Sequence, residues 1–357
     1  MSSSPAESIE LNAPACVVLD TNVWRKELLL TTPLGEALEF ALIRLDASLG
    51  LPEVVERELY KHLLAAGREA KDRISQGEYV LTRLIGESVS GYGIRGFARL
   101  PWEDSSFDED RIIAGITERL KSLEQFLVRV GFRVEHAKAA LDRVMDQSPP
   151  NGPNNQQYKD SAIWEAVLEL ASDYSTLFVT GDKGFFRDRT PARGLASNLA
   201  MECEEKGLDI FVYPDIGECL GALGIAGPPI NVEAVAHAIA AVLRNNLEAA
   251  AGRRGFALQP PLDVEVDRYP TRGSEKLAVG YRLKFLLDDL SGTGIRKGVM
   301  FVTGEAALDI RGGRVGDIRL HDVRLSWTDE TGEEFLAGDA EIYDEVNSLS
   351  NQTYPID

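Results

Sequence analysis

The sequence predicts an α/β protein with a parallel sheet, followed by a smaller α+β region with an antiparallel sheet. Two short apolar runs, Cys16–Leu19 and Thr176–Thr180, have the composition of strands buried on both faces. Helical patterns alternate with these runs, which indicates parallel strands joined by crossover helices. After about residue 260, strand-like segments follow one another with glycine-rich turns between them, which indicates antiparallel pairing.

Helices are predicted wherever apolar residues recur at a spacing of three to four. They cover, in chain order, residues 33–49, 53–75, 110–130, 134–145, 157–171, 192–206, 215–223 and 231–251. Further strands are predicted at 209–213, 262–268, 276–287, 297–303, 306–311 and 315–327.

The pattern breaks most clearly at Gly224–Ile230, where glycine and proline interrupt it. We therefore predict a flexible tail over residues 1–14, an α/β domain over 15–226 and an α+β domain of unknown role over 227–357. The last of these ends in an acidic tail, because Thr328–Glu345 carries eight carboxylates.

The chain is acidic, with 57 Asp and Glu against 38 Lys and Arg and a net charge of -19 over 357 residues. It therefore lacks the basic footprint that is typical of duplex-binding proteins, and a nucleic-acid substrate would require a divalent metal or a local basic rim. Three widely spaced cysteines, without a disulfide pattern, favour a reducing compartment. No membrane span or secretory leader is apparent, so we expect a cytoplasmic protein.

Two aspartates stand where the predicted buried strands end. Asp20 directly follows the first strand, and Asp182 follows the second after a glycine. The carboxyl ends of parallel strands meet at one edge of a sheet, where ligands bind in α/β proteins. The structural alternative for both residues is turn or helix-cap chemistry.

Two further acids have unusual local settings. Asp160 lies near the start of the helix that follows the breaker SPPNGPNN, where an ordinary N-cap is the alternative. Glu58 has Val54, Val55 and Ala65 as neighbours on its helix face, and a buried glutamate there requires compensation. It could instead reach water at the edge of that face, and the nearby Glu53 and Glu56 are alternatives to it.

These acids together predict a metal site. If the two strands are neighbours, Asp20 and Asp182 lie roughly 5–10 Å apart. Like charges at such a distance raise one another's pKa and cost stability unless a cation lies between them. Hard oxygen ligands suit Mg²⁺ or Mn²⁺. Zinc is disfavoured, because none of the four histidines pairs with Cys or another His at ligand spacing.

The ordered set of motifs DTN, PEVVEREL, KDSAIWEAV and LFVTGDKGFF resembles the PIN-domain nuclease family over about residues 15–223. The resemblance implies a doubly wound α/β/α sandwich around a short parallel sheet, with a helical insertion between the second and third motifs. It also implies a hydrolase that cuts single-stranded RNA with Mg²⁺ or Mn²⁺.

The resemblance maps the catalytic acids onto Asp20, Glu58, Asp160 and Asp182. Three of them, Asp20, Asp160 and Asp182, would bind metal, with Asn22 and Thr180 in supporting positions. The basic residues beside the two later motifs are candidate phosphate ligands, although ordinary surface charge on a loop is an alternative at least as good. They are Lys159, Lys183, Arg187 and Arg189.

Other functions stay open at this point. The same site chemistry suits a structure-selective DNA nuclease, and the unassigned C-terminal sheet suits a catalytically weak or silent binding or scaffold protein. A phosphatase of the aspartyl-phosphate type would want an acid at Asn22. The partners considered are RNA, an inhibitory or scaffold protein and a second copy of the chain, with no membrane.

Overall fold

The structure is a computed structural model that describes residues 9–85, 109–152, 157–290, 297–328, 333–337 and 354–356. The chain forms two compact units, each discontinuous in sequence. The α/β unit comprises Ala13–Leu29 and Ser48–Val212. The α+β unit comprises Met1–Asn12, Leu30–Ala47 and Tyr213–Asp357.

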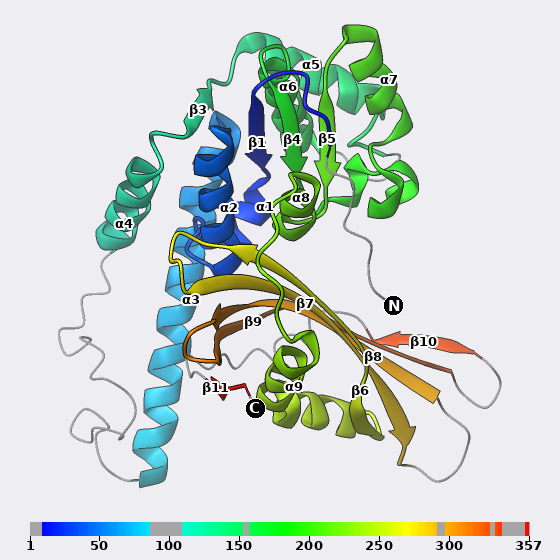
Figure 1. Cartoon of the computed structure of the whole chain (residues 1–357). Coiled ribbons are helices and arrows are strands. Elements are labelled where there is room, and N and C mark those ends of the chain that lie inside the picture. Colours follow the sequence, from blue (N-terminus) through cyan, green and yellow to red (C-terminus); the bar gives the residue numbers. More distant parts are fainter. Residues whose placement is uncertain are drawn as a thin grey trace. The chain divides into compact units, whose positions relative to one another are not determined.

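The α/β unit is built on a parallel sheet with the strand order β3-β2-β1-β4-β5. Its strands are β1 (Ala15–Leu19), β2 (Ser48–Pro52), β3 (Leu127–Val130), β4 (Ser175–Val179) and β5 (Ile210–Tyr213). Figure 1 shows β1, β4 and β5 side by side with the same direction. Every residue of β1 and β4 is buried, as the continuous apolar runs predict.

Helices flank the parallel sheet and complete the predicted α/β/α sandwich. They are α1 (Thr21–Lys26), α3 (Glu53–Ile85), α4 (Glu109–Ser122), α5 (Val134–Met145), α6 (Tyr158–Leu170) and α7 (Ser197–Lys206). Three 3₁₀ turns follow β4, namely η2 (Lys183–Phe185), η3 (Arg187–Arg189) and η4 (Pro191–Arg193). The apolar helix α6 packs on β2, β3 and β4, and the fold class expected from the sequence is confirmed.

One predicted element of this unit is wrong. The apolar spacing predicts a helix over 110–130, but α4 ends at Ser122 and residues Leu127–Val130 form β3. This short strand pairs with β2 in parallel, with Leu127 opposite Leu49. This segment becomes an edge strand because pairing with β2 satisfies its backbone hydrogen-bonding groups. That is a tertiary effect, which the local spacing of apolar residues cannot predict.

The α+β unit contains an antiparallel sheet in the order β10-β9-β8-β7-β6, with β11 paired to β9. Its strands are β6 (Phe256–Pro270), β7 (Lys276–Asp289), β8 (Lys297–Asp309), β9 (Arg314–Thr328), β10 (Glu334–Ala337) and β11 (Tyr354–Pro355). The predicted strands 297–303 and 306–311 are one strand, because an irregularity at Gly304 bends β8 without ending it. A Cβ at Gly304 would collide with the Arg319 carbonyl and the Tyr281 hydroxyl.

The helices that the structure describes in this unit are α2 (Pro33–Leu45), α8 (Ile216–Ala222) and α9 (Val232–Gly252). The buried face of α9 forms one core with the apolar residues of β7, β8 and β9. Although α2 lies between β1 and β2 in the sequence, it packs on α8, β6, β7 and β8. The Thr32 hydroxyl accepts a hydrogen bond from the Gly35 N–H at 3.1 Å and caps its first turn.

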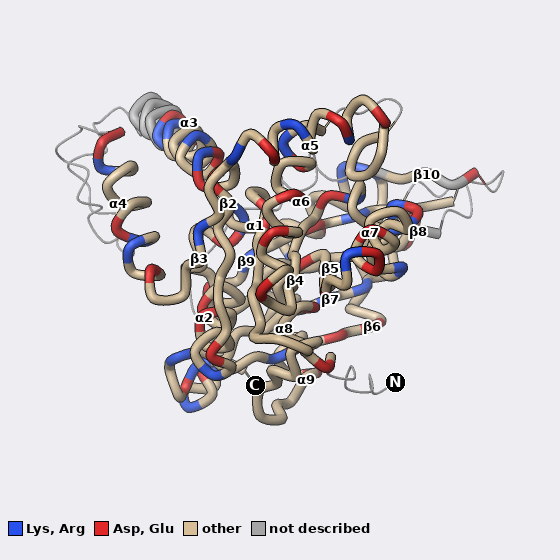
Figure 2. The backbone as a smooth tube through the Cα atoms, turned by 90° about the horizontal axis from the view of Figure 1, so that it is seen from above, with Lys and Arg blue, Asp and Glu red and all other residues tan. Residues whose placement is uncertain are grey.

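The remaining expectations concern the ends and the surface of the chain. Most of the predicted acidic tail, Thr328–Glu345, lies outside the described residues, and the expected domain limits stay predictions. Figure 2 shows basic and acidic residues interspersed along α3, α4 and α5. In the described part of the chain, every helix is too short or too polar to cross a membrane.

Candidate metal centre

The chain leaves the two adjacent central strands, β1 and β4, in opposite directions along the sheet. From β1 the chain proceeds to β2 and β3 on one side, and from β4 it proceeds to β5 on the other. The carboxyl edge between β1 and β4 is therefore the topological switch point, where α/β sheets bind ligands. Asp20 follows β1 there, and its backbone N–H donates to the Val179 carbonyl of β4 at 2.9 Å.

Asp20 is a buried acid, 3% exposed, at the start of α1. It occupies the N-cap position, but its side chain makes no capping hydrogen bond, so the structural alternative does not account for it. Instead the Thr180 hydroxyl donates to Asp20 Oδ2 at 2.9 Å. Thr180 is fully buried and also accepts the Asp182 N–H at 3.0 Å. One hydroxyl thus ties the two strand ends together.

Asp182 is held from two sides. Its Oδ1 accepts the Gly184 N–H at 2.7 Å, which is the turn chemistry that the sequence left open. Its Oδ2 accepts a hydrogen bond from Gln157 Nε2 at 2.7 Å. Gln157 is the N-cap residue of α6, so Asp160 lies inside the first turn of this helix rather than at the cap.

Glu58 reaches the same place from α3. The Thr21 hydroxyl donates to Glu58 Oε2 at 2.8 Å, and the Lys159 ammonium donates to Oε1. The two alternatives on this helix bind elsewhere: Glu53 accepts the Phe132 N–H at 2.7 Å, and Glu56 faces Arg129 at 3.6 Å. Of the three neighbouring acids, Glu58 is therefore the one that meets the switch point.

The electrostatics of the acids show that they share one environment. The pKa of Asp20 is raised to about 6, chiefly by burial, with the charges of Asp182 and Glu58 contributing to the rise and the Thr180 hydrogen bond opposing it. The pKa of Asp160 is raised to about 7, again chiefly by burial, with the charges of Asp20, Asp182 and Glu58 contributing to that value. A side-chain hydrogen bond to Asp182 also contributes to the raised pKa of Asp160.

The donor set fits a hard divalent cation. Within the described residues, no ion pair reaches Asp20, Asp160 or Asp182, and the Lys159 ammonium pairs with Glu58 alone among the four acids. No three of the four acids in the described chain bring one oxygen each to within 4.8 Å of one another. Magnesium typically binds through one or two carboxylates, with water and substrate phosphate completing its shell. The arrangement suits that mode better than an all-protein cage.

The structure distributes the remaining predicted residues around this centre. Thr180 lies within it, whereas Asn22 is exposed on α1. Lys159 contacts Glu58 rather than standing free as a phosphate ligand. Lys183 and Arg187 are exposed in the 3₁₀ turns after Asp182.

Two residues at the centre were missed by the sequence analysis. Thr21 carries the hydroxyl that orients Glu58, and its position directly after Asp20 could have suggested it. Gln157 orients Asp182, and its Oε1 is a buried acceptor with no partner in the described part of the protein. Its place at the end of the breaker gave no indication of this contact, because the contact depends on β4 lying beside α6.

Comparison with known proteins gives one match. The model of the PIN domain family matches residues 17–185, a range that contains all four acids. No curated protein matches the chain, and no solved structure matches it. Over residues 17–185 the chain is therefore similar to the PIN domain family, whose members are generally nucleases.

Proposed function

We propose that the protein is a divalent-metal-dependent endoribonuclease that hydrolyses phosphodiester bonds of single-stranded RNA. The observation that carries the proposal is the convergence of Asp20, Glu58, Asp160 and Asp182 at the switch point, with raised pKa values at Asp20 and Asp160. Acids held together without a resident cation are costly, and a divalent ion relieves that cost. The PIN domain match supports nuclease chemistry in general.

The side chains divide the work of the reaction. Asp20, Asp160 and Asp182 would hold Mg²⁺ or Mn²⁺, which when bound supplies a water of lowered pKa and neutralises charge on the phosphate. The Thr180 hydroxyl keeps Asp20 oriented. Glu58, with Oε2 held by Thr21, is placed to accept the proton that the attacking water loses. The contribution of the protein is mainly positioning and electrostatics.

The test is cleavage of a labelled single-stranded RNA by the full chain with Mn²⁺, Mg²⁺ or a chelator. We expect metal-dependent cleavage, and a loss of about 10²- to 10³-fold on Asp20→Asn. The matched control is Asp173→Asn, an exposed aspartate after α6. No cleavage with any metal by folded wild-type protein would refute the proposal.

Two alternatives are separated by the same experiment. Faster cleavage of branched or single-stranded DNA than of RNA would favour the DNA nuclease. Absence of both cleavage and calorimetric Mn²⁺ binding would favour a silent binding or scaffold role.

A further inference from the structure

A pocket of about 310 Å³ lies directly beside the acidic centre. It begins at Gly184, whose N–H donates to Asp182, and extends to the first turn of α7. Gly184 is needed there, because a Cβ would approach the Pro150 carbonyl oxygen to 2.7 Å. The volume lies at the lower end of the range for small-molecule sites, which suits a single nucleotide.

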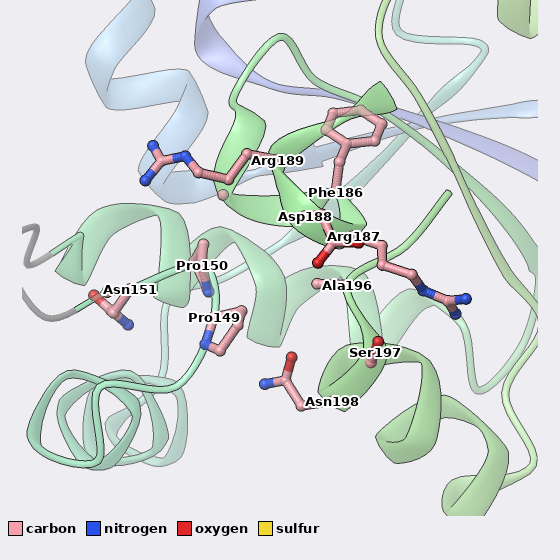
Figure 3. Close-up of a pocket in the computed structure, with 12 residues that line it drawn as sticks. Pro149, Pro150, Asn151, Phe186, Arg187, Asp188, Arg189, Ala196, Ser197 and Asn198 are labelled. Carbon is pink, nitrogen blue, oxygen red and sulfur yellow. The ribbon is translucent and has the colours of Figure 1, made fainter. Parts of the chain in front are cut away.

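The lining combines an apolar wall with cations. Pro149, Pro150 and Ala196 form the apolar side, and Asn198 projects an amide toward them (Figure 3). Arg187 and Arg189 leave η3 in opposite directions, to either side of the pocket (Figure 3). The pocket therefore offers an apolar surface between two positive groups.

The two arginines are unusual in this acidic chain. Both are exposed, and within the described residues neither guanidinium has an ion-pair partner, whereas the nearby Arg193 pairs with Asp188. The backbone that presents them is strained, since Asp188 and Arg189 have φ values of 52° and 56°. Unpaired guanidinium groups are suited to phosphate oxygens, which they bind through paired N–H donors.

The adjoining helix adds to the positive potential. The N-cap residue of α7 is Ala196, which has no side chain to cap the helix, so the N–H groups of the first turn lack that partner. The helix is fixed in place by Glu202, which accepts hydrogen bonds from Arg143 at 2.7 Å and from Trp164 of α6 at 3.1 Å. The pocket wall is thus held by buried contacts.

We infer that this pocket is a subsite for one nucleotide of the substrate strand beside the cleaved bond, with Arg187 and Arg189 binding the phosphates on either side of it. The inference rests on the proposed function for its choice of ligand. Because the two guanidinium groups diverge, a ligand with two successive phosphates fits better than one with a single phosphate. The sugar and base of the intervening nucleotide then lie against the two prolines.

The test measures binding of a 5′-phosphorylated RNA dinucleotide, which carries two phosphates, to the full chain in chelator. We expect it to bind at least tenfold more tightly than the mononucleotide. Arg187→Ala and Arg189→Ala should each weaken dinucleotide binding about tenfold. Each should thereby remove the difference in affinity between the dinucleotide and the mononucleotide. Asn198→Trp, an exposed position at the pocket, should fill the space and weaken binding of both ligands.

Controls make the outcomes distinct. Arg73→Ala removes an exposed arginine on α3 and should leave binding of both ligands unchanged. Mn²⁺ binding, measured by calorimetry, should be retained in every pocket variant. The subsite would be overturned if Asn198→Trp bound the dinucleotide as tightly as wild type does. It would also be overturned if Arg73→Ala weakened dinucleotide binding as much as Arg187→Ala and Arg189→Ala do. If the pocket variants behave as expected but wild type cleaves no RNA, the subsite stands and the proposed function fails.

Discussion

Two groups of buried or half-buried carboxylates in the α/β unit are compensated in opposite ways. On α5, α6 and α7, Arg143 donates to Glu165 at 2.6 Å and to Glu202 at 2.7 Å, and Lys206 donates to Glu202 at 2.8 Å. Burial alone would raise the pKa of Glu202, but these cations and the Trp164 N–H lower it below its ordinary value.

At the switch point, the pKa values of Asp20 and Asp160 are raised instead, because burial is joined by neighbouring negative charge. Asp20 accepts its side-chain hydrogen bond from the neutral Thr180 hydroxyl rather than from a cation. The comparison teaches that a buried acid with a cation of its own stabilises the fold. A buried acid without one is suited to binding a cation from solution.

The largest expected effect is on the compensated group. Arg143→Met should destabilise the protein by about 3 kcal/mol, because Glu165 loses this guanidinium partner and Glu202 keeps only Lys206. Urea or thermal denaturation in chelator measures the change. Arg73→Met, at an exposed pair, should cost less than about 1 kcal/mol. Equal costs at both positions would break the comparison.

The opposite sign is expected at the metal centre. Asp160→Asn should stabilise the metal-free protein at pH 8 by about 1–3 kcal/mol, because it removes a charge that burial and three neighbouring acids disfavour. The midpoint of thermal unfolding in chelator should rise. Glu202→Gln serves as the matched substitution and should lower the midpoint, so a fall in both variants would contradict this prediction.

The pH dependence follows from the same two raised pKa values. Between about pH 4 and pH 7, folded Asp20 and Asp160 keep protons that the unfolded chain releases, so metal-free stability falls as pH rises through this window. Mn²⁺ competes with those protons, and its affinity should rise up to about tenfold per pH unit for each proton displaced. Calorimetry from pH 5 to 8 measures it, and an affinity independent of pH would exclude these ligands.

The smallest effect is expected from the hydroxyl that joins the strand ends. Thr180→Val should lower the cleavage rate about tenfold, because Asp20 loses a hydrogen bond of 2.9 Å and the Asp182 N–H loses its acceptor. Thr176→Val, in the strand β4 that precedes Thr180 and equally buried, should leave the rate unchanged. A similar loss in both variants would mean that strand packing, rather than orientation of Asp20, is responsible.

The sequence was informative where a residue's neighbours along the chain decide its place. The apolar runs before Asp20 and Asp182 were sufficient to predict β1 and β4, and hence a common edge. The family resemblance then added Glu58, which the sequence alone could not separate from Glu53 and Glu56. The roles of these acids in metal binding and catalysis stay predictions.

What the sequence could not provide are contacts between segments far apart in the chain. Gln157 and Thr21 act through partners 25 and 37 residues away. The strand β3 depends on pairing with β2, and the helical spacing that continues through Leu123 and Leu127 concealed it. Such features become visible only when the register of the sheet is known.

The helix α2 belongs to the α+β unit, and this limits where the chain can be truncated. Residues Leu34, Leu38 and Leu42 of this helix are buried in the α+β unit, although the helix is encoded between the first two strands of the parallel sheet. A protein shortened to residues 1–226 would lack β6, β7 and β8 and would expose these leucines to water. Truncation at the apparent boundary should therefore yield an aggregating product, whereas replacing the C-terminal part by a homologous one that retains the α2 contacts should preserve solubility.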